Sequence, residues 1–213
     1  VLPATIDLTV PSPMEFAEYL VKTYLQAYGF TTVKQITHLK TGEALRKNVS
    51  DVLQDMLQEQ VVQKVVLEGF PSVLVRSELI EKPIRKNSSE IRFLSPFDNS
   101  IIHRDRIKQF FDFDYRIECY TPKEKRQYGY FCLPILFGGT FIGRMDCKAH
   151  RKEKLLELIH LHIENGSIDF ELWGKPFAAQ LKQFAAFNGC ETIRLTQVSP
   201  PKFTDAIQRV LQE

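Results

Sequence analysis

The stretch from Leu94 to Gly143 constrains the fold most, because turn residues and strand-like alternation follow one another along it. It begins with a turn at Ser95-Pro96-Phe97-Asp98-Asn99. Tyr115–Tyr120 then alternates between polar and apolar side chains, which is typical of a half-buried strand. Tyr128–Pro134 has the composition of a returning strand. The two segments therefore predict a hairpin, whose tip carries Lys123, Lys125 and Arg126.

More β structure is expected after this hairpin. Gly138-Gly139 turns the chain into a strand that starts at Thr140, and Lys154–Glu164 alternates as a longer strand. A helix, a strand and a closing helix are then predicted, and they begin at Pro176, Cys190 and Thr204. This order predicts an antiparallel β-sheet or small barrel with a packed C-terminal helix.

The N-terminal part has helical patterns instead. A capping box, Ser12-Pro13-Met14-Glu15, opens the first helix. Two further helices begin at Thr32 and Glu43, and the β-branched segments Val61–Leu67 and Val73–Val75 follow them as a hairpin. Three helices before a hairpin are the order of a winged helix-turn-helix.

The predicted fold class is therefore α+β. It has a lead-in over residues 1–13, a winged helix domain over 14–76 and an antiparallel, barrel-like β domain over 77–213.

The charges of the predicted winged helix do not favour DNA binding. Between Glu15 and Glu68 there are six basic and seven acidic residues, and the candidate recognition helix has only Arg46 and Lys47 on the basic side. Phosphate contact depends on Lys and Arg. We therefore expect this domain to pack against neighbouring domains, and Arg46 and Lys47 are kept as candidate DNA contacts.

Composition excludes several classes of protein. The net charge of +2 is too small to indicate nucleic-acid binding by itself, and four scattered cysteines without CxxC spacing favour a reduced protein. No signal peptide or membrane-spanning run is visible, so a cytoplasmic location is expected. The chain starts at Val1 rather than Met, which suggests a piece of a longer protein.

Basic residues near aromatic rings are the strongest functional signal. Arg104 and Arg106 follow the first turn, and the predicted hairpin tip lies among tyrosines. Positive charge beside aromatic rings suits a nucleic-acid backbone with bases that can stack. The alternative is a solvated hairpin end, which the acidic residues Asp105 and Glu124 favour.

Other polar pairs have structural interpretations. His160 and His162 would face the same way on a strand, but no third or fourth ligand lies nearby, so no metal is expected. Asp112 and Asp114 suit capping or ion pairing. Asp98 suits a bond to the backbone two residues on.

Three motifs in the stretch resemble one known family. They are the Ser95–Asn99 turn, Phe111-Asp112-Phe113-Asp114-Tyr115-Arg116 and Lys125-Arg126-Gln127-Tyr128-Gly129-Tyr130. Together they resemble the C-terminal region of the YcaQ/AlkZ-like DNA glycosylases, winged-helix proteins that remove alkylated or crosslinked bases. The resemblance implies a double-stranded DNA partner, no cofactor and an upstream winged-helix region. It also implies that the barrel region faces DNA, through Arg104, Arg106, Lys123, Lys125 and Arg126.

The same resemblance places catalysis outside this chain. The family's catalytic motif is Gln-aliphatic-Gln or Gln-aliphatic-Asp in its N-terminal half. The similar triplet here, Gln58-Glu59-Gln60, has a charged middle residue at the end of a helix, so we assign it no catalytic role. We thus expect the DNA-binding, scaffolding part of a glycosylase. The competing hypothesis is a non-catalytic winged-helix module, a transcription regulator or scaffold that binds DNA or protein.

Overall fold

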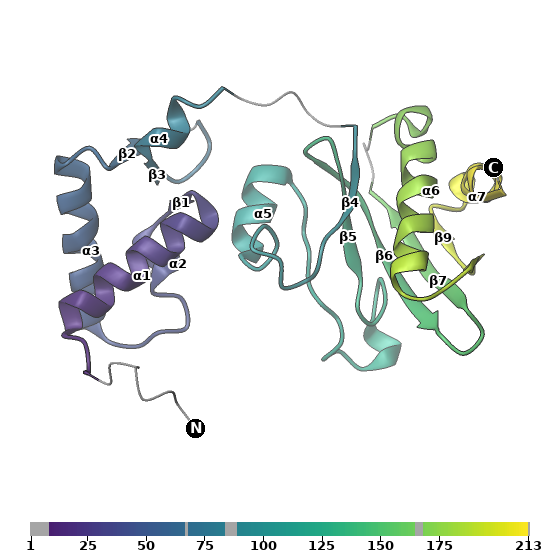
Figure 1. The fold of residues 1–213 in the computed structure, drawn as a ribbon, viewed down its shortest axis with the longest axis horizontal. Helices are drawn as coiled ribbons and strands as arrows, with labels where there is room; N and C mark the ends of the chain where they lie inside the picture. Colours follow the sequence, from purple (N-terminus) through teal and green to yellow (C-terminus); the bar gives the residue numbers. More distant parts are fainter. Residues whose placement is uncertain (1–8, 67, 84–88, 165–167, 213) are drawn as a thin grey trace. The chain divides into compact units, whose positions relative to one another are not determined.

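The structure is a computed structural model that describes residues 9–66, 68–83, 89–164 and 168–212. The chain forms two compact units, residues 1–84 and residues 85–213, and each unit has its own hydrophobic core (Figure 1). All four cysteines are free. Within the described residues, no helix is long and apolar enough to cross a membrane.

The first unit packs helices against a small antiparallel sheet. Its strands are arranged in the order β1-β3-β2. The elements follow the predicted order of three helices and a hairpin, with a short strand added after the first helix. They are α1 (Pro13–Tyr28), β1 (Phe30–Thr31), α2 (Val33–Ile36), α3 (Glu43–Gln58), β2 (Val62–Val65), β3 (Val73–Arg76) and α4 (Ser77–Ile80).

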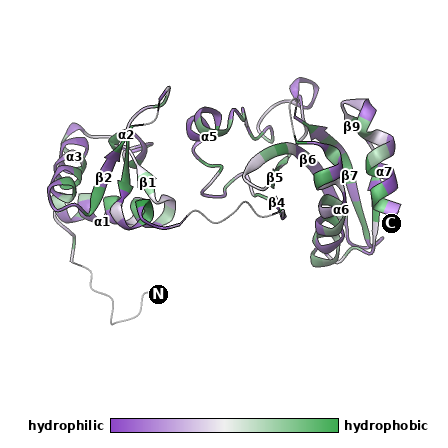
Figure 2. Cartoon of the chain, turned by 90° about the horizontal axis from the view of Figure 1, so that it is seen from above, coloured by the Kyte–Doolittle hydropathy of each residue, from purple (hydrophilic) through white to green (hydrophobic). Residues whose placement is uncertain are grey.

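Local capping fixes where these helices begin. The Ser12 N–H donates to the Glu15 carboxylate at 2.7 Å, and the Glu15 N–H donates to Ser12 Oγ at 3.3 Å, which confirms the capping box. Thr32 caps α2 in the same way, accepting the N–H of Gln35 at 3.2 Å. Figure 2 shows hydrophilic and hydrophobic residues alternating along α3, whose inner face packs against α1.

The second unit is built on a curled sheet of strands in the order β4-β5-β6-β7-β8, and β9 also pairs with β7. Helix α6 packs against this sheet, and residues of both form one core (Figure 1). The elements are β4 (Ile91–Phe93), α5 (Arg104–Phe111), η1 (Lys123–Lys125), β5 (Leu133–Phe137), β6 (Thr140–His150), β7 (Leu155–Ile163), α6 (Phe170–Phe187), β8 (Thr192–Leu195), β9 (Val198–Ser199), η2 (Pro201–Phe203) and α7 (Thr204–Gln212).

The sheet is mixed, so the prediction of an antiparallel sheet is confirmed for β4 to β7 and was wrong for β8 and β9. Strands β4 to β7 pair antiparallel, but β7 pairs parallel with both β8 and β9. The reason is the connection after β7. Helix α6 carries the chain back along the sheet, and a strand that follows such a crossover runs parallel to the one before it.

Helix α6 begins before the predicted start at Pro176. It is capped by Asp169, which accepts the N–H of Glu171 at 3.3 Å, and Pro176 lies inside the helix. A proline in a helix interior costs about 3 kcal/mol. Burial of Trp173 offsets this cost, because its indole lies in the core, stacks edge-on against Phe170 and donates to the Ile168 carbonyl at 2.9 Å.

The predicted hairpin of Tyr115–Tyr120 and Tyr128–Pro134 is also wrong. Neither Tyr115–Tyr120 nor the segment before Leu133 is a strand, and the expected tip forms the short helix η1. The backbone of residues 115–131 is instead held by carboxylates, and we call this segment the carboxylate-anchored loop.

Two acidic side chains take the place of a pairing strand in this loop. The Glu118 carboxylate accepts the N–H groups of Gln127, Tyr128 and Gly129 at 2.8, 2.7 and 3.0 Å. The Asp146 carboxylate accepts those of Tyr130 at 2.7 Å and the next residue at 3.3 Å. These bonds satisfy donors that a sheet ladder would otherwise satisfy.

The turn at Ser95–Asn99 has the predicted internal bond. Asp98 Oδ1 accepts the N–H of Ser100 at 2.8 Å, and the backbone N–H of Ile101 donates to the Asp98 carbonyl. We expect Asp98→Ala to lose the side-chain bond and about 0.5–1.5 kcal/mol of stability. Urea denaturation measures this loss, and Asp98→Asn, which keeps an acceptor oxygen, is the control. Equal midpoints for Asp98→Ala and the parent would contradict the structural role.

Candidate nucleic-acid interface

The carboxylate-anchored loop presents a cluster that we call the basic tip, made of Tyr120, Lys123, Lys125, Arg126 and Tyr130. Both lysines are exposed, and neither forms an ion pair within the described part of the chain. The two tyrosines are 87% and 54% exposed. The tip therefore combines positive charge with aromatic rings that are open to a ligand.

The arginine of the tip is oriented by its neighbours. The Arg126 Nε–H donates to the Thr121 carbonyl at 2.9 Å, and the guanidinium lies 4.9 Å from the centre of the Tyr130 ring. This geometry fixes the side chain and leaves the outer guanidinium nitrogens without a bond to another described residue. A guanidinium held in this way can meet a phosphate without losing much further freedom.

The structure buries most of the predicted pair Arg104 and Arg106, unlike the exposed lysines of the basic tip. Arg104 and Arg106 lie on α5. Arg104 donates to the carbonyls of Ile101 and Pro96 at 2.7 and 2.9 Å and lies over the Tyr115 ring, and Arg106 is only 6% exposed. The Arg104 side chain thus holds the turn and α5 together, and little of either arginine faces solvent.

The two candidate DNA contacts that the sequence analysis kept from the N-terminal unit lie on α3. Arg46 and Lys47 are both exposed. The exposed acidic residues Glu43, Asp55 and Glu59 lie on the same helix or at its end. The mixed charge that the sequence predicts for this surface is therefore present. Gln58 and Gln60 are exposed at the C-terminal end of α3, where Gln60 has a left-handed φ of 60°.

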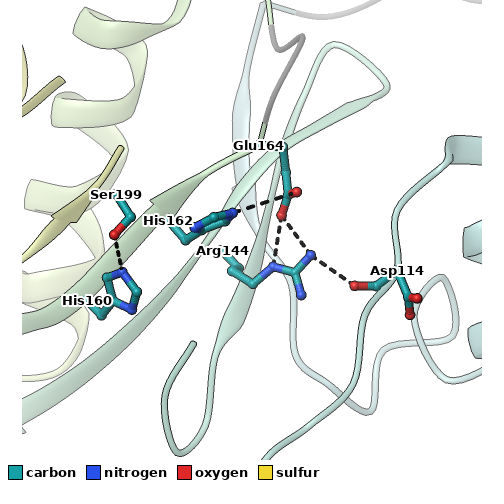
Figure 3. A network of polar contacts seen from close by, with 6 residues as sticks. All are labelled: Asp114, Arg144, His160, His162, Glu164 and Ser199. Carbon is teal, nitrogen blue, oxygen red and sulfur yellow. Dashed lines mark hydrogen bonds and ion pairs between the residues drawn. The ribbon is translucent and has the colours of Figure 1, made fainter. Parts of the chain in front are cut away.

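A buried arginine that the sequence did not single out lies against Tyr128 of the carboxylate-anchored loop. Arg144 is 2% exposed, and its Nε and Nη2 donate to Glu164 Oε1 at 2.9 and 2.7 Å (Figure 3). Nη2 also donates to the Asp114 carbonyl at 3.0 Å. The guanidinium lies between two rings, 4.4 Å from the centre of Phe113 and 4.1 Å from that of Tyr128.

The histidine pair beside this network contacts protein groups through its ring nitrogens. His160 bonds through its two ring nitrogens to the Tyr128 carbonyl and to Ser199 Oγ, both at 2.9 Å, whereas His162 lies 3.9 Å from Glu164 (Figure 3). Burial lowers the pKa of His162, and Arg144 lowers it further against the opposing effect of Glu164. Among the described residues, no group of three His, Cys, Asp or Glu could hold a metal ion.

The aspartates have the structural roles that the sequence predicts. Asp112 ends α5 in the left-handed conformation, with φ of 48°. Asp114 pairs with Lys108 at 2.8 Å, and this bond lowers the pKa of the carboxyl despite the opposing effect of burial.

Comparison with known proteins identifies the family. A family model described as DNA glycosylase AlkZ-like matches residues 1–187, which is most of the chain. No solved structure matches the chain significantly. The three motifs that carry the resemblance in the sequence all lie within the matched residues. The chain belongs to the AlkZ-like DNA glycosylase family.

Proposed function

We propose that this chain is the DNA-binding and scaffolding part of a glycosylase that removes alkylated or crosslinked bases from double-stranded DNA. The basic tip is the observation that carries the proposal, because Lys123, Lys125 and Arg126 are oriented or exposed beside open aromatic rings. Such a surface suits phosphates together with a base that can stack. Family membership supports duplex DNA as the partner.

The first unit acts as a scaffold in this proposal. Its order α1-β1-α2-α3-β2-β3, with the β1-β3-β2 sheet, supports a winged helix, in which α2 and α3 form the helix-turn-helix. The acidic residues along α3 weaken its attraction for phosphates, so in this proposal it packs against neighbouring domains rather than entering a DNA groove. Arg46 and Lys47 add at most secondary contacts. The cytoplasmic location that the sequence predicts is compatible with a DNA-repair role and is part of this proposal.

The predicted pair Arg104 and Arg106 offers little charge to DNA. Arg104 holds α5 to the Ser95–Asn99 turn, and Arg106 is only 6% exposed, so the charge that DNA meets comes from the tip. We assign no catalytic residue, no metal and no cofactor to the chain.

Replacing Lys123, Lys125 and Arg126 together with alanine should weaken binding to all duplex sequences alike. If each residue contacts one phosphate, the slope of log K against log salt concentration should become shallower by about 2.7, at about 0.9 per contact. Fluorescence anisotropy with a labelled duplex, titrated at several salt concentrations, measures the slope.

A matched control removes the same charge elsewhere on the second unit. Lys148, Arg151 and Lys152 are exposed at or near the turn between β6 and β7. Their triple alanine variant should keep a slope much closer to that of the parent. Equal slopes for the parent and the tip variant, or equal losses in the two triple variants, would remove the tip as the DNA contact.

A further inference from the structure

A polar pocket is lined by residues of the carboxylate-anchored loop, by Asp114 before it and by the buried Arg144. Its volume is about 250 Å³, slightly below the roughly 300–1,000 Å³ typical of sites for drug-sized ligands. The size suits one small ring system. Its walls are formed by Asp114, Arg116, Glu118, Gln127, Tyr128 and Arg144.

Segments far apart in the sequence form this pocket. Asp114 and Arg116 come from the first half of the carboxylate-anchored loop and the residues before it, Gln127 and Tyr128 from its second half, and Arg144 from β6. The three bonds from Glu118 to the returning backbone hold the two halves together. The pocket is therefore built by the fold and does not depend on one mobile side chain.

Arg144, which lines this pocket, leaves both N–H donors of one nitrogen without a partner among the described residues. Its Nε and Nη2 bond to Glu164 and Asp114, but Nη1 is buried and has no partner among the described residues. A buried donor without a partner is costly, so an acceptor that reaches it binds favourably. Because the atom is covered in the structure, the pocket wall has to shift slightly for this bond to form.

The charges of the pocket favour a neutral ligand. Arg144 is already paired with Glu164, and Asp114 with Lys108. This leaves Arg116 and Glu118 as opposite charges, so the lining attracts neither an anion nor a cation strongly. Donors and acceptors are both available, since the side chain of Gln127 supplies one of each kind of group. The ring of Tyr128, half-buried against Arg144, adds a flat wall.

We propose that this pocket binds a neutral nucleobase, with Arg116 and Arg144 donating to its acceptors and the carboxylates accepting from its N–H groups. A nucleobase is flat, carries donors and acceptors on one edge and is small enough for the volume. The inference rests on the proposed function, because bound DNA supplies the base. A base enters such a pocket only after it leaves the stack, at a cost that the pocket contacts repay.

The first test uses free guanosine, so that it does not depend on DNA binding. Saturation-transfer NMR on the whole chain should show transfer to the base proton H8 rather than to the ribose. Arg116→Gln, at the exposed rim, should raise the Kd about ten-fold through the loss of one charged hydrogen bond. Arg92→Gln, an exposed arginine on β4 that does not line the pocket, should leave it unchanged.

The second test places the base in DNA. A duplex with one 2-aminopurine opposite an abasic site should change its emission when saturated with the parent chain, and Arg116→Gln should lose this change while it still binds the duplex. The triple alanine variant of the tip should bind duplex more weakly but keep its affinity for guanosine. The absence of a base signal in both arms, or equal signals from Arg116→Gln and the parent, would overturn the pocket. Guanosine binding without DNA binding would support the pocket and overturn the proposed function.

Discussion

Glu164→Gln should destabilise the second unit by about 3 kcal/mol, the lower end of the range for breaking a buried ion pair. The physical reason is Arg144, which is 2% exposed and relies on one oxygen of Glu164 for two of its hydrogen bonds. Removal of the negative charge leaves a buried guanidinium without its counter-charge. The partial exposure of Glu164 screens the pair and keeps the loss near the lower end of that range.

A second substitution separates the ion pair from simple packing. Arg144→Met combined with Glu164→Gln removes both charges and leaves a flexible apolar chain between Phe113 and Tyr128. The double variant should be more stable than Glu164→Gln alone, because no unpaired charge remains buried. Urea denaturation followed by the fluorescence of Trp173 measures both, since this is the single tryptophan and lies in the core of the second unit. A double variant that is less stable than Glu164→Gln would show that the unpaired charge of Arg144 is not what destabilises Glu164→Gln.

Glu118→Gln should loosen the carboxylate-anchored loop and lower stability at pH 7 by about 1–3 kcal/mol. Burial raises the pKa of Glu118, but the three backbone N–H donors and Arg144 outweigh it, so the pKa is lowered. A lowered pKa means that the carboxylate stabilises the fold fully above its unfolded pKa of about 4.3 and loses that contribution as the pH falls through the folded value.

The parent and Glu118→Gln should therefore differ most near neutral pH and converge as the pH falls below about 4. Denaturation at pH 7, 5, 4 and 3 with the same tryptophan signal tests this. Glu124→Gln, an exposed glutamate of η1 in the same loop that forms no ion pair with another described residue, is the control and should behave as the parent does. A stability difference that stays constant across the range would mean that the Glu118 charge does not hold the loop.

Local signals in the sequence predicted the first unit well. The capping box at Ser12 and the cap at Thr32 need only neighbouring residues, so the starts of α1 and α2 were visible in advance. The turn bond of Asp98 is equally local. The strand at Lys154–Glu164 was confirmed as β7, because a long alternation of apolar and polar side chains is typical of a strand with one buried face.

The errors arise where distant residues decide the structure. The alternation at Tyr115–Tyr120 suits a strand, but an extended loop buries Tyr115 just as well when Glu118 and Asp146 satisfy the facing backbone. The buried Arg144 and the pocket that it lines were missed for the same reason. Arg144 has the pattern of an exposed basic residue on a strand, and its burial depends on Glu164, 20 positions later, and on a carbonyl 30 positions earlier.

The most direct test of the DNA interface is a backbone amide NMR titration of the whole chain with a short duplex. If the basic tip binds the phosphate backbone, the largest shift changes should fall between Tyr120 and Tyr130 and fade as salt is raised, since phosphate contacts release counterions. Amides of α3 should change much less. Shifts centred on α3, with the tip unaffected at saturation, would contradict the account and make the first unit the DNA-binding surface.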